Sequence, residues 1–261
     1  MNILFIGDII GRPARKTLSK FVPQLIHEYM IDFIIANGEN LAGGVGLTKE
    51  TAEEMFALGI NVLTSGNHIW AKKDAFELLQ NDKRVLRPLN YPEQCPGRGY
   101  TIIDTPDAHS VAVVNLMGRV YIQSLECPFK AIEDLLAKLA KHTKIIIVDF
   151  HAEATSEKIA MGWFLDGKVS AVMGTHTHIQ TSDETLLPQQ TAYITDVGMV
   201  GPIDSVIGMD KDTALYRFIT QIPAKLEVAK GPCVLGATVI SIDAATGRST
   251  SIKRLLIKEP N

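Results

Sequence analysis

Several stretches of this 261-residue sequence end an apolar run with side chains that can bind a cation. The apolar runs are rich in β-branched residues and stop at glycine or at a polar residue, which is typical of buried strands in a parallel sheet. Loops at the carboxyl ends of such strands converge on one crevice, so these side chains are expected to meet there. They are Asp8, Glu39, Asn40, Asn67, His68, His151, His176 and His178.

The residue types in this set indicate a metal site. Carboxylates combined with neutral imidazoles suit borderline divalent ions such as iron, manganese or zinc, and the absence of cysteine from the set disfavours a closed structural zinc site. His176 and His178 are two positions apart, so in an extended segment both side chains would point the same way. The set is too large for one tetrahedral ion and fits two ions that share a carboxylate, an arrangement that catalyses in-line displacement at phosphorus.

The elements that must position this site alternate between strands and helices. Strand patterns occur at 2–6, 33–36, 60–63, 111–114, 144–148 and 169–173, and helical patterns at about 13–30, 48–59, 71–80, 125–141 and 156–164. This alternation predicts an α/β domain with helices packed on a sheet. Strand patterns at 191–195, 237–242 and 251–257 would form a second sheet on the first. No linker, repeat or composition shift divides the chain, so a single domain over residues 1–261 is expected.

Composition excludes several classes of protein. Hydrophobic residues make up 46% and charged residues 21%, which rules out wholesale disorder. The net charge of −3 does not favour binding of long nucleic acid. Cys95, Cys127 and Cys233 form no C-x-x-C motif, which favours a reducing compartment. The N-terminus does not resemble a signal peptide, and no apolar stretch approaches the ~18 residues of a membrane helix, so a cytoplasmic protein without membrane contact is expected.

The order of the motifs resembles that of the calcineurin-like metallophosphoesterases. The matching elements are Gly7-Asp8, Gly38-Glu39-Asn40, Gly66-Asn67-His68, His151 and His176-Thr177-His178. Two features are similar to the YmdB-like branch of that family. Glu39 stands where most relatives have a bridging aspartate, and Ile10 stands where most have a histidine. Segments 5–13 and 195–202 are also similar to that branch.

This resemblance implies a four-layer α/β fold, an αββα sandwich of two facing sheets with helices outside. It also implies a phosphodiesterase acting on small cyclic nucleotides such as 2′,3′-cyclic AMP. The implied cofactors are two divalent or mixed-valence metal ions, with iron in first place and manganese or zinc as alternatives. The implied ligands are Asp8, Glu39, Asn40 and His178 for one ion, and Glu39, Asn67, His151 and His176 for the other. Asn40 would partly replace the histidine that is absent at Ile10.

A mechanism and two alternative functions follow from this set of residues. A hydroxide that bridges the two ions would attack phosphorus, and His68 is expected to face the substrate and to protonate or hydrogen-bond the leaving oxygen. A phosphomonoesterase or nuclease with the same metal site stays open, as does a regulatory metal-binding protein with weak catalysis. A homo-oligomer stays open too. His27, His109 and His142 follow no strand in a motif and are expected to be structural.

Four features near the motifs have two interpretations each. Asp149 and Glu153 flank His151 and either orient it or lie in solvent. The Gly43–Gly46 stretch precedes a helical pattern and either cradles a phosphate or forms a flexible loop. Asp196 either lines the pocket or forms a turn at the end of a strand.

Overall fold

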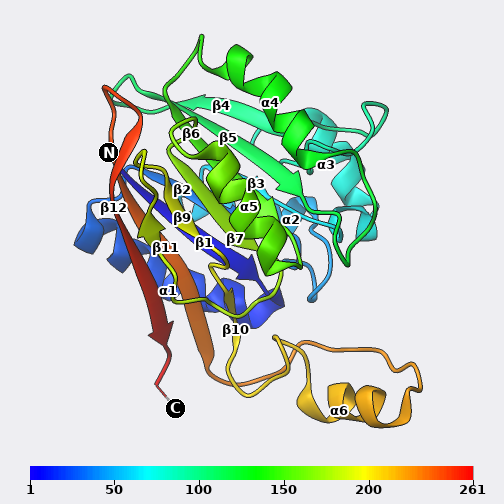
Figure 1. The fold of residues 1–261 in the computed structure, drawn as a ribbon. Coiled ribbons are helices and arrows are strands. Elements are labelled where there is room, and N and C mark those ends of the chain that lie inside the picture. Colours follow the sequence, from blue (N-terminus) through cyan, green and yellow to red (C-terminus); the bar gives the residue numbers. More distant parts are fainter. Residues whose placement is uncertain (261) are drawn as a thin grey trace.

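The computed structural model describes residues 1–260 (Figure 1). The strands are β1 Asn2–Ile9, β2 Phe33–Asn37, β3 Val62–Thr64, β4 Tyr100–Asp104, β5 Ser110–Met117, β6 Ile145–His151, β7 Ala171–Thr175, β8 Thr185–Leu186, β9 Ala192–Ile194, β10 Met199–Pro202, β11 Cys233–Asp243 and β12 Arg248–Lys258. The helices are α1 Gly11–Tyr29, α2 Lys49–Ala57, the 3₁₀ helix η1 Ile69–Ala71, α3 Asp74–Asn81, α4 Pro128–Leu139, α5 Thr155–Leu165 and α6 Lys211–Thr220.

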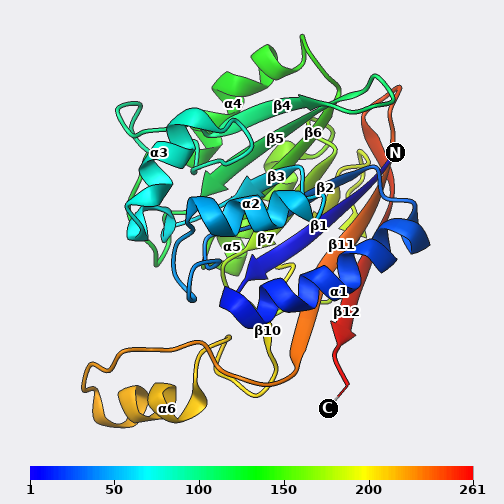
Figure 2. The same cartoon turned by 180° about the vertical axis from the view of Figure 1, so that it is seen from behind.

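These elements form a four-layer α/β sandwich. One six-stranded sheet has the order β12-β11-β10-β1-β2-β3 and the other the order β4-β5-β6-β7-β9-β8. Helices α1, α2 and α3 cover the outer face of the first sheet, and α4 and α5 cover that of the second (Figures 1 and 2). The four-layer fold expected from the sequence is therefore confirmed.

The alternation of side chains along β1 shows why a continuous apolar run becomes a central strand. Leu4 and Ile6 face α1, where Leu18 of that helix is also fully buried. Ile3 and Phe5 face the opposite way, into the layer between the two sheets. Successive side chains of a strand point to opposite faces, so a strand that is buried on both faces requires apolar residues at every position.

The parallel strands at the centre of each sheet place their carboxyl ends at one edge of the molecule. In the first sheet β1, β2 and β3 run parallel, and in the second β5, β6, β7 and β9 do. The pairing of β1 with β2 shifts register between Ile6 and Asp8, as in a β-bulge. Such a bulge re-aims the side chain that follows it, here Asp8 at the edge where the loops meet.

Every strand and helix predicted from the sequence overlaps an observed one, but one prediction about their arrangement is wrong. The three C-terminal strands do not form a sheet of their own. β11 and β12 extend the first sheet, because β11 pairs antiparallel with β1 and with β12, whereas β9 joins the second sheet beside β7. The sequence patterns did not predict β4, β8, β10 and α6. Within residues 1–260 no helix has the length and apolar character needed to cross a membrane.

Candidate metal centre

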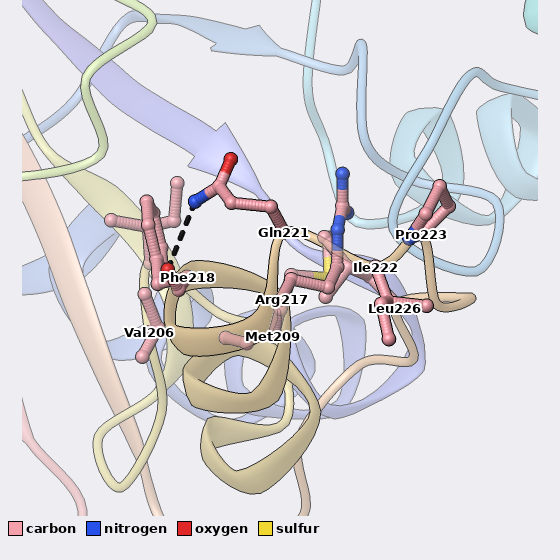
Figure 3. A pocket seen from close by; sticks show the side chains of 10 residues that line it. Val206, Met209, Arg217, Phe218, Gln221, Ile222, Pro223 and Leu226 are labelled. Carbon is pink, nitrogen blue, oxygen red and sulfur yellow. Dashed lines mark hydrogen bonds between the residues drawn. The ribbon is translucent and has the colours of Figure 1, made fainter.

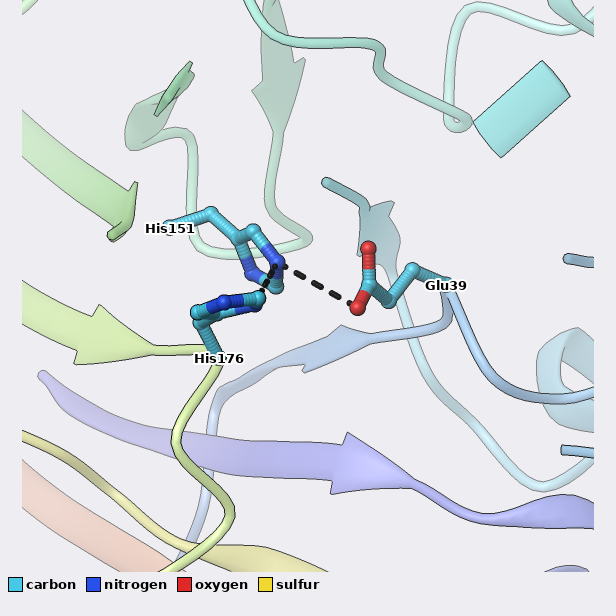
Figure 4. Close-up of side chains that lie close together, drawn as sticks. All are labelled: Glu39, His151 and His176. Atoms are coloured by element: carbon cyan, nitrogen blue, oxygen red, sulfur yellow. Dashed lines mark hydrogen bonds and ion pairs between the residues drawn. The ribbon is translucent and has the colours of Figure 1, made fainter. Parts of the chain in front are cut away.

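The carboxyl ends of β1, β2, β3, β6 and β7 bring the predicted site residues together. Two clusters can each offer ligand atoms that lie within 4.8 Å of one another. Glu39, His151 and His176 form one cluster (Figure 4), and Asp8, Glu39 and His178 form the other. Of the described residues, Glu39 alone belongs to both clusters. The structure therefore places a single carboxylate between two groups of candidate ligands.

The remaining predicted site residues lie against these clusters. Asn67 Oδ1 lies 3.3 Å from His151 Nε2. Asn40 Nδ2 lies 3.2 Å from Glu39 Oε1 and 3.4 Å from the His178 ring. A half-turn of an amide exchanges its oxygen and nitrogen, so either atom can face a cation. His68 belongs to neither cluster, and its backbone N–H donates to Glu39 Oε2 at 3.2 Å.

Two backbone features make this approach of side chains sterically feasible. A Cβ at Gly66 would overlap His151 Nε2 and Glu39 Oε2, so only glycine fits there. His176 and His178 have φ of 101° and 66°, the left-handed region, and follow β7 in a turn. The two histidines therefore do not lie in an extended segment, in which both side chains would point the same way. The turn directs His176 to one cluster and His178 to the other.

Asp8 has the burial and the unpaired carboxylate oxygen expected of a cation ligand. It is fully buried, and its Oδ1 has no hydrogen-bond donor within residues 1–260, while Oδ2 accepts from the backbone N–H of His176 at 3.1 Å. Burial raises the pKa of Asp8 to about 7, although the charges of His178 and His151 lower it. An orphaned carboxylate oxygen in the protein interior is costly, and a bound cation would satisfy it.

The pair of Glu39 and His151 also fits a site that binds a cation. Glu39 Oε1 lies 3.2 Å from His151 Nε2. Burial would raise the pKa of Glu39, but the charge of His151 and its hydrogen bond lower it to about 2. Burial would lower the pKa of His151, but the charge of Glu39 and its hydrogen bond raise it to about 9. Each group thus stabilises the charged form of the other, and a cation that bound here would compete with the proton of His151.

Asp149 orients His151 through a hydroxyl group. Thr175 Oγ1 donates to Asp149 Oδ1 at 2.7 Å and therefore accepts from His151 Nδ1 at 2.9 Å. Asp149 Oδ2 also accepts from Thr64 Oγ1 and from Asn37 Nδ2. The side chain is fully buried, so of the two interpretations of Asp149 the orienting one holds. His151 Nε2 is left to face the clusters, as in metal-binding histidines.

The other two histidines are oriented in the same way by different neighbours. His178 Nδ1 donates to the carbonyl oxygen of Ile207 at 2.9 Å, which leaves Nε2 facing Asp8 Oδ1 at 3.8 Å. His176 Nε2 lies 3.1 Å from Glu153 Oε2, which leaves Nδ1 facing inward. Burial and the charge of His151 together lower the pKa of His176 to about 3, so the inward nitrogen carries a lone pair. Glu153, whose side chain is 47% exposed, therefore contacts His176 and does not orient His151.

A buried ion pair that no sequence pattern predicts holds the turn between His176 and His178. Lys158 Nζ on α5 lies 2.6 Å from Asp196 Oδ2, and both side chains are 1% exposed. The same oxygen accepts from the backbone N–H and the hydroxyl of Thr177, at 3.1 and 2.7 Å. Asp196 is thus buried and fixes Thr177, the residue between the two histidines, by two hydrogen bonds. It is not an isolated turn residue.

We expect Lys158→Met to lower the free energy of unfolding by about 3–5 kcal/mol, because it leaves Asp196 buried without its partner. Urea unfolding followed by circular dichroism measures this loss. Lys211→Met is the matched control, because Lys211 and Asp204 pair at the same distance of 2.6 Å on the surface, and it should change stability little. An unchanged urea midpoint for Lys158→Met would show that the pair does not stabilise this turn.

The chain is similar to known proteins over nearly its whole length. A family model described as YmdB-like protein matches residues 4–255. The chain is 46% identical over 259 residues to the 2′,3′-cyclic-nucleotide 2′-phosphodiesterase of Bacillus subtilis (strain 168), which covers 99% of this chain and 98% of that protein.

Two solved structures are similar throughout. A hypothetical protein from Thermus thermophilus has 39% identity and a TM-score of 0.94, with 100% of both chains covered. A protein described as a novel phosphatase, from Mycoplasma pneumoniae, has 32% identity and a TM-score of 0.92, with 99% of this chain and 93% of that chain covered.

Proposed function

This chain belongs to the YmdB-like protein family, and from that premise we propose that it is a metal-dependent phosphodiesterase acting on small cyclic nucleotides such as 2′,3′-cyclic AMP. The observation that carries the proposal is the pair of ligand clusters that share Glu39. The relative from Bacillus subtilis, 46% identical to this chain, is named for this activity. The family and the site therefore support the same reaction class.

The described side chains fit two divalent cations, with iron first and manganese or zinc as alternatives. Asp8 Oδ1 lacks a donor, and each of the three histidines directs one ring nitrogen inward. The residues that would hold one ion are Asp8, Glu39, Asn40 and His178, and those for the other are Glu39, Asn67, His151 and His176. When bound, such ions supply a nucleophile from water at neutral pH and positive charge for the phosphoryl oxygens.

The protein's own contribution is to hold these groups and to place a proton near the leaving oxygen. Hydrogen bonds to Thr175 and Ile207 fix the rings of His151 and His178 before substrate arrives. His68 is tied to Glu39 through its backbone, while its half-buried ring is free of both clusters. That placement suits a group that donates a proton or hydrogen bond to the leaving ribose oxygen.

Side chains from both sheets pack in one apolar layer. We therefore include in the proposal that residues 1–261 act as one domain. Ile3 and Phe5 of β1 pack in the same core cluster as Val113 of β5 and Ile147 of β6. A ligand set drawn from both sheets requires the sheets to be fixed to each other, which this shared core supplies.

We expect the purified protein to contain two metal ions per chain and to prefer the cyclic diester. Metal content is measured by mass spectrometry. Turnover is compared on 2′,3′-cyclic AMP, bis(p-nitrophenyl) phosphate and p-nitrophenyl phosphate, with kcat/KM for the cyclic diester above that for the monoester by about tenfold or more. Protein stripped by a chelator is the control and should regain activity with manganese or iron.

A preference for the monoester would favour the second candidate, a phosphomonoesterase, which the name of the Mycoplasma pneumoniae structure supports. Full metal content without turnover on any of the three substrates would instead indicate a regulatory metal-binding protein.

A further inference from the structure

The segment between β10 and β11, residues 203–232, forms an arm that projects from the body of the molecule (Figures 1 and 2). It contains α6, in which Ala214 is the one buried residue. Within residues 1–260 fifteen large apolar side chains are exposed, and seven of them lie between positions 203 and 222. Single exposed apolar residues are ordinary on a protein surface, whereas a cluster of this kind marks a place where another surface binds.

The base of the arm is closed on itself and fixed to the body. The N–H of Asp210, just before α6, donates to the carbonyl oxygen of Glu227 at 2.8 Å. A Cβ at Gly44 would lie 2.9 Å from Met209 Cε, so the Gly43–Gly46 stretch of the body packs closely against the arm. These contacts hold α6 in one position, and a surface that is held in place binds a partner at a lower entropic cost.

The inner side of α6 is packed loosely on its own chain. It borders a cavity of about 370 Å³, which Ala214, Arg217 and Gln221 line from the helix end of the arm (Figure 3). A helix of ten residues is marginal in water by itself, and most of its stability in a protein comes from packing of an apolar face. The contacts of α6 with residues 1–260 supply little such packing, so a further surface is needed.

The outward side of α6 has the apolar stripe that such packing requires. Leu215, Phe218 and Ile219 have the spacing i, i+3 and i+4, which places them on one face of the helix. They are 51%, 72% and 78% exposed, and Ile222, just after the helix, is 52% exposed. Leu215 and Ile219 do not line the cavity, so the stripe faces away from the inner side.

The size of the exposed apolar surface matches one side of a protein interface. A large side chain carries roughly 150–250 Å² of surface, so the seven residues, which are 41–78% exposed, present about 700 Å². The largest apolar patch of a typical monomer is about 300–600 Å². Each partner in a standard interface buries about 800 Å². The arm therefore offers most of what one side of a stable dimer needs.

The charge of the arm favours a second copy of this chain over a membrane or a nucleic acid. Residues 203–232 contain four acidic and four basic side chains, so their net charge is zero. Helices that lie on membranes are rich in lysine and arginine on their polar face, and nucleic-acid surfaces are basic. A neutral apolar surface meets its own copy without net repulsion, and twofold dimers, in which the same patch is used twice, are the commonest oligomers.

We propose that α6 forms the centre of a homodimer interface, in which the stripes of two copies pack antiparallel across a twofold axis. Leu215 of each chain then lies near Ile219 of the other. This arrangement places the N-terminus of each helix beside the C-terminus of its partner, which the helix dipoles favour. The interface goes beyond the proposed function, since no residue of the two ligand clusters lies in the arm.

The test measures the mass of the full-length protein by sedimentation velocity at about 10 μM, because interfaces of this size have dissociation constants of about 1 μM or less. The unchanged protein is expected to be a dimer. Ile219→Glu should raise the dissociation constant at least about 100-fold, because it brings two carboxylates together in an apolar interface. Trp163→Glu is the matched control, because Trp163 is 58% exposed on α5, outside the arm, and it should stay dimeric. Circular dichroism checks that both variants are folded.

A monomer at this concentration in the unchanged protein would overturn the proposal. Undiminished dimer affinity in Ile219→Glu would also overturn it, since the interface would then lie elsewhere on the molecule. Sedimentation with phosphatidylcholine vesicles tests the other occupant, and the unchanged protein should stay in solution. Binding to the vesicles that Ile219→Glu abolishes would mean that the stripe binds lipid and not a second copy.

Discussion

The Glu39→Gln variant is expected to lose its bound metal ions and, with them, its turnover. Glu39 is the residue that joins the two clusters, and glutamine keeps its size while removing the charge that two cations would share. We expect kcat on 2′,3′-cyclic AMP to fall by more than about 10³-fold, since loss of one preorganised electrostatic contact already costs about 10²–10³-fold. Metal content per chain and turnover of the same preparation measure the two effects together.

The control for this variant is Glu153→Gln, which changes a carboxylate at the edge of the same site. Glu153 contacts His176 alone among the candidate ligands, and its side chain is 47% exposed. Its variant should keep both ions, with metal affinity lowered by about 10–100-fold at most, as for residues that orient a ligand. Two ions per chain in Glu39→Gln would show that Glu39 is not the shared ligand.

The positions of the candidate ligands could be predicted because they follow from local patterns and one rule of topology. The runs at 3–6 and 145–148, which precede Asp8 and His151, are apolar at every position, which identifies strands buried on both faces. Parallel strands end at one edge, so the residues at those ends meet even though they are far apart in sequence. The family resemblance, which the family model now confirms, added the division into two ligand sets.

What could not be predicted depends on contacts between distant segments. The turn that separates His176 from His178 is held by Asp196 and Lys158, and no local spacing links those two positions. β10 was missed because it pairs with β1 over only two residues and contains Gly201 and Pro202. α6 was missed because its apolar residues are largely exposed and form no stripe that faces the core.

The structure gives a physical reason for isoleucine at position 10, where the family pattern has histidine. Asn40 was expected partly to replace the histidine absent at Ile10, and its amide does lie 3.4 Å from His178 and 3.2 Å from Glu39. Ile10 itself is fully buried, and its side chain would be 2.7 Å from a Cβ at Gly208, in the segment between β10 and α6. An apolar residue here lets this segment pack beside the site, where a histidine would place a polar ring against it.

The His68→Ala variant is expected to keep its metal and lose most of its turnover on the cyclic nucleotide. His68 belongs to neither ligand cluster, so two ions per chain should remain. Loss of a positioned proton donor typically costs about 10²–10⁴-fold, and we expect a fall in kcat of that size on 2′,3′-cyclic AMP. Metal analysis and turnover, with the exposed His142→Ala as the control, measure both outcomes.

Two substrates with different leaving groups distinguish proton donation by His68 from its other roles. A ribose oxygen leaves poorly without a proton, whereas p-nitrophenolate is stable as an anion, so His68→Ala should slow bis(p-nitrophenyl) phosphate hydrolysis far less than cyclic nucleotide hydrolysis. Equal losses on the two substrates would mean that His68 positions Glu39, to which its backbone N–H donates, and does not supply the proton. A metal site left empty by the substitution would instead assign His68 as a ligand.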